Sequence, residues 1–313
     1  MAHLSARLLI VPALLAFAAP AFAGAKDSAH KKESRKGANY WSGMAAHDMK
    51  ADTCWMVPGE SSNTDEWIMF DIPRVAVDKI GMIVGWTKSE ETFKDYARVK
   101  KIRVEAFVFD DSNELVPVGK PVDVEFEDKP EMQIVDIEDL TGGTSNGKVK
   151  LIIKEIYPGE DYPNFAVSEA LIFLSEFDVA ATISAISSED DKNTRDALLD
   201  DNPKTVWTGP AEGASFTLDA AGASLASVSL VSSSKNFARP KKVEITAQGR
   251  SRVVELPDDL EPHPMWVPTA FGYTGGSWGA VEVKILEVYP GTKSADTLSL
   301  AEIDAKASNN DGF

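Results

Sequence analysis

The stretch KEIYPGEDYP (154–163) has a counterpart, LEVYPGTKSA, at 286–295. Glu169 and Glu302 follow the two Tyr-Pro-Gly phrases at nearly the same distance. Further matching blocks occur in the same order along the chain: HDMKADTCW (47–55) with LDDNPKTVW (199–207), RVKKIRVEA (98–106) with RPKKVEITA (239–247), and GTSNGKVKLIIKEIYPG (143–159) with GGSWGAVEVKILEVYPG (275–291). This order predicts a tandem duplication, with copies at 38–177 and 178–308.

Each copy has the pattern of a β-protein. Short runs rich in branched and aromatic residues, such as KKIRVEAFVF and AVEVKILEV, alternate apolar with polar side chains and are separated by Pro, Gly, Asn and Asp. Only NTRDALL (193–199) has a helical pattern, and it is short. The sequence therefore predicts an all-β fold made of two tandem antiparallel sandwiches.

The two ends of the chain differ from these copies in composition. Residues 1–23 resemble a secretory leader, with Arg7 before the apolar run LLIVPALLAFAA and the small residues AFA at its end. We expect cleavage after Ala23 and a secreted or periplasmic protein. The next stretch, KDSAHKKESRK, lacks apolar residues and predicts a disordered basic arm at 24–37. Residues 309–313 are expected to form a tail.

Charge and cysteine content narrow the choice of partner. The formal net charge is -17, which repels nucleic acid and anionic membrane surfaces and leaves neutral ligands, basic partners and cations. Cys54 is the only cysteine, so no intramolecular disulfide can form. Its position beside Trp55 favours a buried thiol over a reactive one. Stability must therefore come from apolar cores.

The order of the motifs resembles the NADase-type glycan-binding domain, one of the discoidin-like (F5/8 type C), galactose-binding-like sandwiches. The resemblance rests on the Asp…Thr-x-Trp turn, EWI (66–68), GWTKSEETFKDYARVKKIRV (85–104) and the phrase IYPG…SE. It covers nearly all of the first copy, whereas the second copy has a shorter loop, VSSSKNFARPKK (231–242). The resemblance implies eight-stranded jelly rolls that bind sugars through loops at one end, and it implies no NAD chemistry.

Aromatic residues divide into predicted core and predicted binding surface. Trp55, Trp67 and Trp207 lie in or beside strand patterns and are expected in the core. Trp86 ends an apolar strand and begins a polar loop, so its ring is expected to stack on a sugar while nearby groups bind the hydroxyls. An alternative is that this loop packs against its own domain. The predicted ligand-binding residues are Trp86, Lys88, Tyr96 and Arg98 in the first copy and Lys235, Asn236 and Arg239 in the second.

An insert in the second copy carries further aromatic residues, Trp266, Tyr273 and Trp278. It predicts either a second binding platform or a contact between the two copies.

The Asp-containing turn before Trp207 predicts a calcium site in the second copy. The resemblance implies a loop that wraps Ca²⁺ with carboxylate, hydroxyl and carbonyl oxygens, which this ion prefers. The corresponding residues are Asp200, Asn202, Thr205 and Glu302, with Asp201 in place of a glycine. The first copy retains Asp48, Thr53 and Glu169 but has Met49 and Lys50 in the turn, and the lysine argues against calcium there. The alternative in both copies is a metal-free turn closed by its own hydrogen bonds.

No catalytic motif emerges from the sequence. GTSNG (143–147) and GGSWG (275–279) fit the pattern G-x-S-x-G, but each precedes a strand instead of joining a strand to a helix. The few histidines lack zinc-site spacing. We therefore expect an exported, non-catalytic protein that binds a glycan or glycoconjugate. The alternative is a structural or protein-interaction module that docks on an envelope or extracellular protein.

Overall fold

The computed structural model describes most of the two predicted copies. The described residues are 25–33, 36–37, 40–48, 50–59, 65–72, 76–137, 140, 147–189, 194–220, 223–268, 273–274 and 279–308. The predicted leader (1–23), the tail (309–313) and most of both G-x-S-x-G turns lie outside these ranges.

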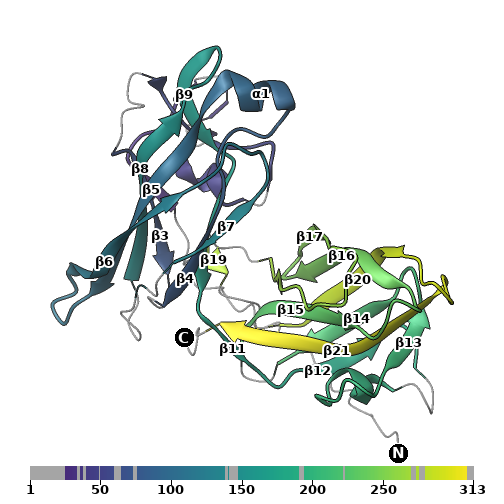
Figure 1. The fold of residues 1–313 in the computed structure, drawn as a ribbon. Coiled ribbons are helices and arrows are strands. Elements are labelled where there is room, and N and C mark those ends of the chain that lie inside the picture. The colour runs from purple at the N-terminus through teal and green to yellow at the C-terminus, as the bar shows by residue number, and fades with distance from the viewer. Residues whose placement is uncertain are drawn as a thin grey trace, which may run out of the picture.

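Two β-sheets form the first half of the chain, residues 25–174 (Figure 1). The larger sheet has the order β1 (Ala25–Asp27), β3 (Trp67–Ile72), β8 (Gly147–Tyr157), β5 (Tyr96–Phe109), β9 (Tyr162–Val167) and β2 (Trp55–Val57), with β6 (Leu115–Glu125) also paired to β5. The smaller sheet contains β10 (Glu169–Leu174), β4 (Val77–Ile83) and β7 (Gln133–Asp136). Among these strands of the first half, neighbours are antiparallel except β5 and β9.

Two five-stranded sheets form the second half, residues 176–308. One has the order β12 (Thr182–Ile186), β14 (Ser215–Asp219), β20 (Val281–Tyr289), β16 (Arg239–Ala247) and β17 (Arg250–Glu255). The other has the order β11 (Glu176–Asp178), β21 (Thr297–Ser308), β15 (Leu225–Ser232) and β18 (Met265–Trp266), with β13 (Trp207–Pro210) also paired to β21. The predicted all-β fold class is confirmed.

The helices of the described residues are all short: η1 (Gly43–Ala46), α1 (Glu90–Asp95) and η3 (Arg195–Leu198). η3 lies within the predicted helical piece. α1 was not predicted, and it begins with a capping box in which the Ser89 and Thr92 side chains each accept the other's backbone N–H. None of these helices could span a bilayer.

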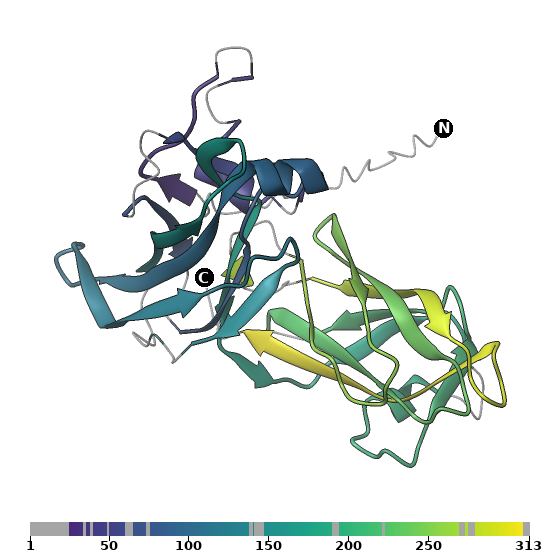
Figure 2. The same cartoon turned by 45° about the horizontal axis from the view of Figure 1, so that its top comes forward.

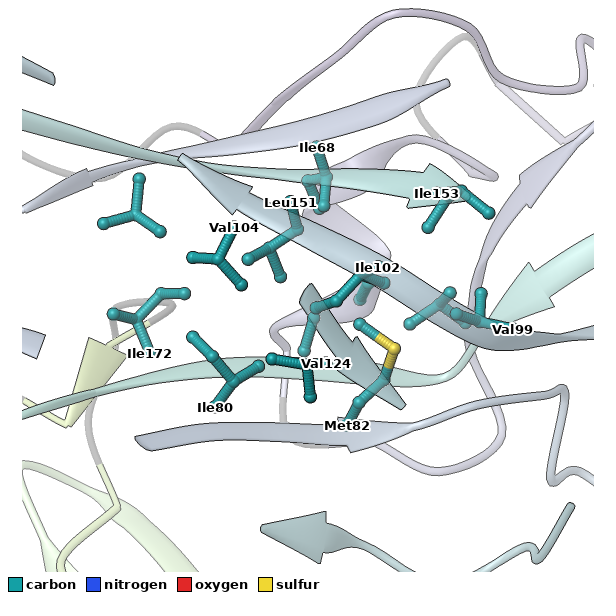
Figure 3. Packing of buried hydrophobic residues seen from close by; sticks show 14 of the residues in the cluster. Ile68, Ile80, Met82, Val99, Ile102, Val104, Val124, Leu151, Ile153 and Ile172 are labelled. Carbon is teal, nitrogen blue, oxygen red and sulfur yellow. The ribbon is translucent and has the colours of Figure 1, made fainter. Parts of the chain in front are cut away.

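Each half has its own hydrophobic core between its sheets. In β3 the inward residues Ile68, Phe70 and Ile72 are buried and alternate with more exposed ones, as a half-buried strand requires. Ile68 packs in the same core as Val104 and Leu151 (Figure 3). Trp55 and Trp207 are fully buried, as predicted. The prediction for Trp67 is wrong: its ring is only partly buried, on the outer face of β3, with the Lys150 ammonium 4.9 Å from the ring centroid.

The predicted disordered arm is also wrong for the residues described. β1 pairs with β3 from Ala25 to Asp27, directly after the predicted cleavage site. The Lys31 backbone N–H donates to the Met56 carbonyl at 2.7 Å, and Trp55 Nε1 donates to the Ala29 carbonyl at 2.9 Å. Backbone pairing at a sheet edge needs no apolar side chains, so composition could not reveal it. The first half therefore begins at 25 rather than 38.

The chain crosses between the halves within one residue, not at 177/178. β10 ends at Leu174, Ser175 donates its N–H to the Ala76 carbonyl of the first half, and β11 begins at Glu176. Glu176 pairs with Ser308 at the end of β21, and its carboxylate accepts from the Ser227 hydroxyl at 2.7 Å. No flexible linker separates the two halves.

A second contact joins the halves at the outer face of β10. Leu171 and Phe173 form a small cluster with Trp266 of the second half, and the Phe173 and Trp266 ring centroids are 6.1 Å apart. The Arg252 guanidinium lies 3.6 Å from the Trp266 centroid, and burial lowers the pKa of Arg252 to about 10. β19 (Tyr273–Thr274) adds to β10 as a parallel strand, visible in yellow-green among the strands of the first half (Figure 1).

The insert therefore forms the predicted contact between halves, and the two lobes touch at this place (Figure 2). Trp278 and the side chain of Tyr273 lie outside the described residues.

The junction predicts a fixed distance between the halves. Spin labels at Lys129→Cys and Glu212→Cys, both exposed sites, should give one narrow distance distribution by double electron–electron resonance. Cys54 is fully buried and should stay unlabelled. Trp266→Ala should broaden the distribution because it removes the aromatic contact. Val253→Ala, on the exposed side of β17, is the control, and an unchanged distribution in the Trp266→Ala protein would contradict the prediction.

Candidate functional site

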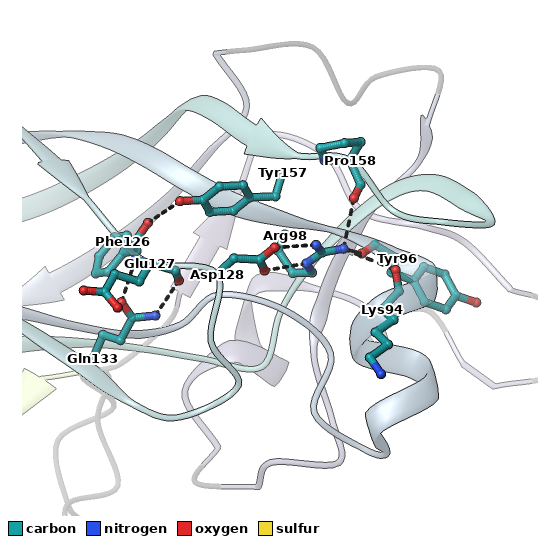
Figure 4. Close-up of polar contacts among 9 residues, drawn as sticks. All are labelled: Lys94, Tyr96, Arg98, Phe126, Glu127, Asp128, Gln133, Tyr157 and Pro158. Atoms are coloured by element: carbon teal, nitrogen blue, oxygen red, sulfur yellow. Dashed lines mark hydrogen bonds and ion pairs between the residues drawn. The ribbon is translucent and has the colours of Figure 1, made fainter.

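A buried arginine organises the loops at one end of the first half (Figure 4). Arg98 lies at the start of β5, and its Nε and Nη2 atoms donate to the Asp128 carboxylate at 2.8 and 2.6 Å. Its Nη1 atom donates to the backbone carbonyls of Lys94, Tyr96 and Pro158 at 3.0–3.2 Å. All three guanidinium nitrogens are thus engaged within the protein. The prediction that Arg98 binds ligand is therefore corrected: its donors are used to fix the loops.

The Tyr-Pro-Gly phrase completes this arrangement. Arg98 pairs with Tyr157 across the sheet, and the Tyr157 hydroxyl donates to the Phe126 carbonyl at 2.9 Å. The next residue supplies the Pro158 carbonyl to Arg98. Gly159 follows where the chain passes so close to the Asp95 carbonyl oxygen that any Cβ atom would collide with it. Each residue of the phrase therefore has a separate structural task.

The second half repeats most of these contacts. Arg239 pairs with Tyr289, donates to Asp258 at 2.7 Å and donates to the carbonyls of Lys235 and Phe237. The Tyr289 hydroxyl donates to the Leu256 carbonyl at 3.0 Å. A Cβ atom at Gly291 would collide with the carbonyl oxygen of Asn236. Arg239 is 5% exposed, so it too is a structural residue and not the predicted ligand donor.

The other two predicted donors of the second half are placed differently. Lys235 is exposed, and its Nζ lies 3.5 Å from the Asp258 carbonyl oxygen. Asn236 is half-buried, and its carbonyl accepts from Lys293 and Ser294. Lys235 therefore remains available to a ligand, while Asn236 mainly closes a turn.

Trp86 is not the exposed platform that the sequence predicted. Only 9% of the residue is exposed, and its Nε1 donates to the Asp52 carbonyl at 3.0 Å. Its ring lies between Trp41 and Tyr96, with both centroid distances 5.3 Å. The alternative prediction, a loop packed against its own domain, is the correct one for this ring. Lys88 is exposed beside it, with its ammonium 5.6 Å from the Trp86 centroid.

Five rings at this end form a continuous aromatic row: Tyr40, Trp41, Trp86, Tyr96 and Tyr162. The interior rings are shielded, whereas the two ends are open to solvent. Tyr162 is 47% exposed and is stacked on Tyr96 at 4.7 Å, and Tyr40 is 37% exposed beside Trp41. Burial raises the pKa of Tyr96. The exposed aromatic surface thus belongs mainly to Tyr162 and Tyr40.

Sequence reasoning missed both exposed tyrosines. One signal was present for Tyr162, because the matching position of the second phrase is Ser294, so the tyrosine is not needed for the shared fold. The row also covers Cys54, where burial raises the pKa of the thiol well above its ordinary range. In the second half, Val206 precedes the buried tryptophan as Cys54 does in the first, and it is 39% exposed. Among the described residues, the aromatic row is therefore an addition of the first half.

The two Asp-containing turns have the same internal hydrogen bonds. Thr205 donates to the Asp200 carboxylate at 2.8–2.9 Å, and the Asn202 N–H donates to it at 3.0 Å. Asp48 holds Thr53 and the Lys50 N–H in the same way. Asp201 has a φ of 54°, the left-handed conformation that glycine usually supplies. These bonds agree with the alternative prediction from the sequence, a metal-free turn closed by its own hydrogen bonds.

Electrostatics nevertheless distinguish the turn of the second half. Burial, followed by the charges of Asp200, Asp201 and Asp304, raises the pKa of Glu302 to about 7. A cation would relieve this crowding. However, no group of three or more His, Cys, Asp or Glu side chains among the described residues is placed to hold a metal. A calcium ion there would need the Thr205 hydroxyl and backbone carbonyls as further ligands.

Comparison with known families identifies the first half. The first half matches an F5/8 type C domain. More narrowly, residues 21–173 match the family model described as the NAD glycohydrolase translocation F5/8 type C domain. The match begins well before residue 38, in agreement with the position of β1. A search of curated proteins found no match.

Several solved structures resemble the chain at low identity. A mutant of the arabinofuranosyltransferase AftD from Mycobacteria is 14% identical (TM-score 0.33), and the match covers 91% of this chain but 29% of the transferase. A fucolectin from striped bass (Morone saxatilis) serum is 14% identical (TM-score 0.31), and the match covers 91% of this chain and 96% of the fucolectin. The family 32 carbohydrate-binding module of C. perfringens NanJ, in complex with galactose, is 17% identical (TM-score 0.32). This match covers 42% of this chain and 99% of the module. Such low scores transfer neither ligand nor activity to this chain.

The structural role of the arginines can be tested by melting. Arg98→Gln and Arg239→Gln should each lower the free energy of unfolding by on the order of 2 kcal/mol, because charge-assisted hydrogen bonds are lost and an aspartate is left unpaired. Arg103→Gln breaks an exposed pair with Asp123 and should change the melting temperature little. Arg98→Gln and Arg103→Gln proteins with equal melting temperatures would contradict the assignment.

Proposed function

We propose that this protein binds glycans through the loop end of its first half, with the Tyr162 ring as the stacking surface. The observation that carries the proposal is the exposed Tyr162 ring, stacked on Tyr96 at the end of the aromatic row. A tyrosine offers an apolar face for a sugar ring and a hydroxyl that bonds sugar oxygens. Because Tyr96 supports it from behind, the ring is already oriented, and little conformational entropy is lost on binding.

The affinity of one such platform should be weak. An aromatic stacking contact contributes about 1–2 kcal/mol, which is less than the roughly 4 kcal/mol that a millimolar dissociation constant requires. Hydrogen bonds to the sugar hydroxyls must supply the rest. The match to an F5/8 type C domain supports sugar binding through loops, in line with what the sequence resemblance implied. The match of residues 21–173 to an F5/8 type C domain supports a role in binding without catalysis.

The alternative function is docking to another protein without sugar recognition. Exposed tyrosines are common in protein interfaces too, so the same rings serve both proposals. Envelope or extracellular proteins are the partners that this alternative names. A glycan array on the exported chain separates the two, because only the first function predicts spots that depend on Tyr162.

We also propose that the two halves are tandem copies of one domain, at residues 25–174 and 176–308. The support is the recurrence of the same arginine, tyrosine, glycine and Asp–Thr contacts in the same order. The leader-like residues 1–23 support export, with cleavage after Ala23. Export would place the protein in the periplasm or outside the cell, where glycans are accessible.

A structural calcium ion in the second half is a further part of the proposal. Asp200, Asn202, Thr205 and Glu302 would supply oxygen ligands, and the raised pKa of Glu302 supports a demand for positive charge. The ion would stabilise the turn before Trp207 and take no part in sugar recognition.

The glycan function predicts opposite effects for two aromatic residues. Tyr162→Ala should weaken glycan binding roughly tenfold and leave the melting temperature nearly unchanged, because the ring is exposed. Tyr162→Phe should retain most of the affinity. Trp86→Ala should instead lower the free energy of unfolding by about 3 kcal/mol, since it opens a cavity between buried rings.

Isothermal titration with an array-selected glycan measures the first effect, and thermal unfolding measures the second. Phe109→Ala, which removes a similarly exposed ring at a distant hairpin, is the matched control for binding. Undiminished binding by the Tyr162→Ala protein would rule out this ring as the platform.

The calcium proposal predicts a melting temperature that depends on the ion. Calcium at about a hundredfold above its dissociation constant should stabilise the protein by about 2.7 kcal/mol over the EDTA-treated form. Asp200→Ala should abolish this difference, whereas Asp48→Ala, in the lysine-containing turn of the first half, should preserve it. If the EDTA-treated and calcium-loaded proteins melt together, the metal-free turn is correct.

A further inference from the structure

Three lysines lie on the aromatic row. The Lys31 ammonium is 5.6 Å from the Trp41 ring centroid, and the Lys36 ammonium is 4.6 Å from the Tyr40 centroid. On the other side, Lys88 is 5.6 Å from the Trp86 centroid. Lys36 and Lys88 are exposed. We call Lys31, Lys36 and Lys88 the row lysines.

The row lysines differ from most other basic residues in how their charge is balanced. Arg98, Lys100, Lys148 and Arg239 each form an ion pair with a carboxylate. In the part of the chain that the structure describes, the row lysines have ring contacts but no such pair. An ammonium over a ring keeps the N–H groups that point away from the ring free for another acceptor. Their charge is thus available to a ligand.

Carboxylates near the row are the main counter-argument. Glu33 accepts a hydrogen bond from Trp41 Nε1 at 3.2 Å, and its charge, with that of Asp95, contributes to the raised pKa of Tyr96. Asp95 is only half exposed, at the end of α1. Asp52, whose carbonyl accepts from Trp86, and Asp161, directly before Tyr162, add further exposed carboxylates. None of these carboxylates forms an ion pair with a row lysine among the described residues, so three ammonium groups at the row remain open to an anion.

The three open ammonium groups contrast with the whole molecule, whose net charge is -17. Screening limits the reach of the distant acidic residues to about 8 Å at physiological ionic strength. A ligand in contact with the row therefore experiences the row lysines more strongly than the rest of the surface. The acidic remainder still repels polyanions that would spread beyond the row, which favours a short local contact.

We infer that the ligand of this site is an acidic glycan, with a sugar ring on the aromatic row and a carboxylate or sulfate at the row lysines. The inference rests on the proposed glycan function and adds the charge class of the ligand. Stacking supplies recognition of the sugar, and the ammonium groups select the anion. Neutral sugars bind the same rings more weakly because they leave the lysine charges uncompensated.

One set of polymers with a common backbone tests the inference: dextran, carboxymethyl dextran and dextran sulfate, titrated into the full mature chain at 50 mM and 500 mM salt. We expect at least tenfold tighter binding of a charged dextran than of dextran at low salt, and a smaller difference at high salt. The two charged polymers separate carboxylate from sulfate recognition. The Lys36→Gln/Lys88→Gln protein should lose the preference and keep its melting temperature.

The matched control is Lys120→Gln/Lys204→Gln, which removes the same charge at exposed sites away from the row and should keep the preference.

Equal affinity for dextran and both charged dextrans overturns the inference but leaves sugar binding intact. Polyglutamate binding as tightly as carboxymethyl dextran also overturns it, because the sugar would then be dispensable. The protein could also bind none of the three dextrans while the array shows Tyr162-dependent binding of neutral glycans. That result overturns the inference of an acidic ligand and leaves the glycan function in place. An array without any Tyr162-dependent glycan rejects the glycan function itself.

Discussion

The loop end of each half depends on one buried arginine at the start of a long central strand. A guanidinium that is nine-tenths buried must find an acceptor for each of its nitrogens, since an unpaired buried charge is expensive. Arg98 satisfies this need with one carboxylate and three carbonyls that come from three separate segments. Those segments are thereby fixed relative to each other, and the Tyr-Pro-Gly phrase is the piece of chain that fits the remaining space. Arg239 likewise pairs with one carboxylate and two carbonyls, and Tyr289 and Gly291 repeat the contacts of Tyr157 and Gly159, which accounts for the second occurrence of the phrase.

On this shared frame the first half carries an extra layer. Its N-terminal segment brings Trp41 against Trp86 and closes the space above Cys54, which leaves Tyr40 and Tyr162 as the exposed ends of the row. The second half has no such layer among its described residues, and Val206, at the position that corresponds to Cys54, is exposed to solvent. The structural difference between the loop ends of the halves thus comes mainly from additions to the loops, while a buried arginine paired with an aspartate is present in both. Loops on a rigid scaffold are where binding residues usually gather.

The sequence predicted the parts of the fold that local pattern determines, and it failed where distant segments meet. The all-β class and the buried Trp55 and Trp207 follow from strand periodicity and turn residues. The exposure of Trp86 could not be read locally, because Trp41, which covers it, lies in a different segment of the chain. Arg98 and Arg239 were mistaken for ligand donors since their partners, Asp128 and Asp258, belong to other loops. The sequence predicted a disordered N-terminal segment, whereas its residues are held by main-chain hydrogen bonds. Such bonds do not depend on amino-acid composition, so composition could not predict them.

The direct passage from β10 through Ser175 into β11 has a consequence for multivalent recognition. Domains joined by a flexible linker can adjust their separation to many arrays of receptors, and the linker sets an effective concentration for the second contact. A chain without such a linker offers its surfaces at one spacing and one angle. A repeating polymer on a cell surface would engage both halves together only if its own period matched that geometry. The one-residue crossing would then fix the distance between the two halves. The protein would select a polymer by the distance between its repeating units as well as by its chemistry.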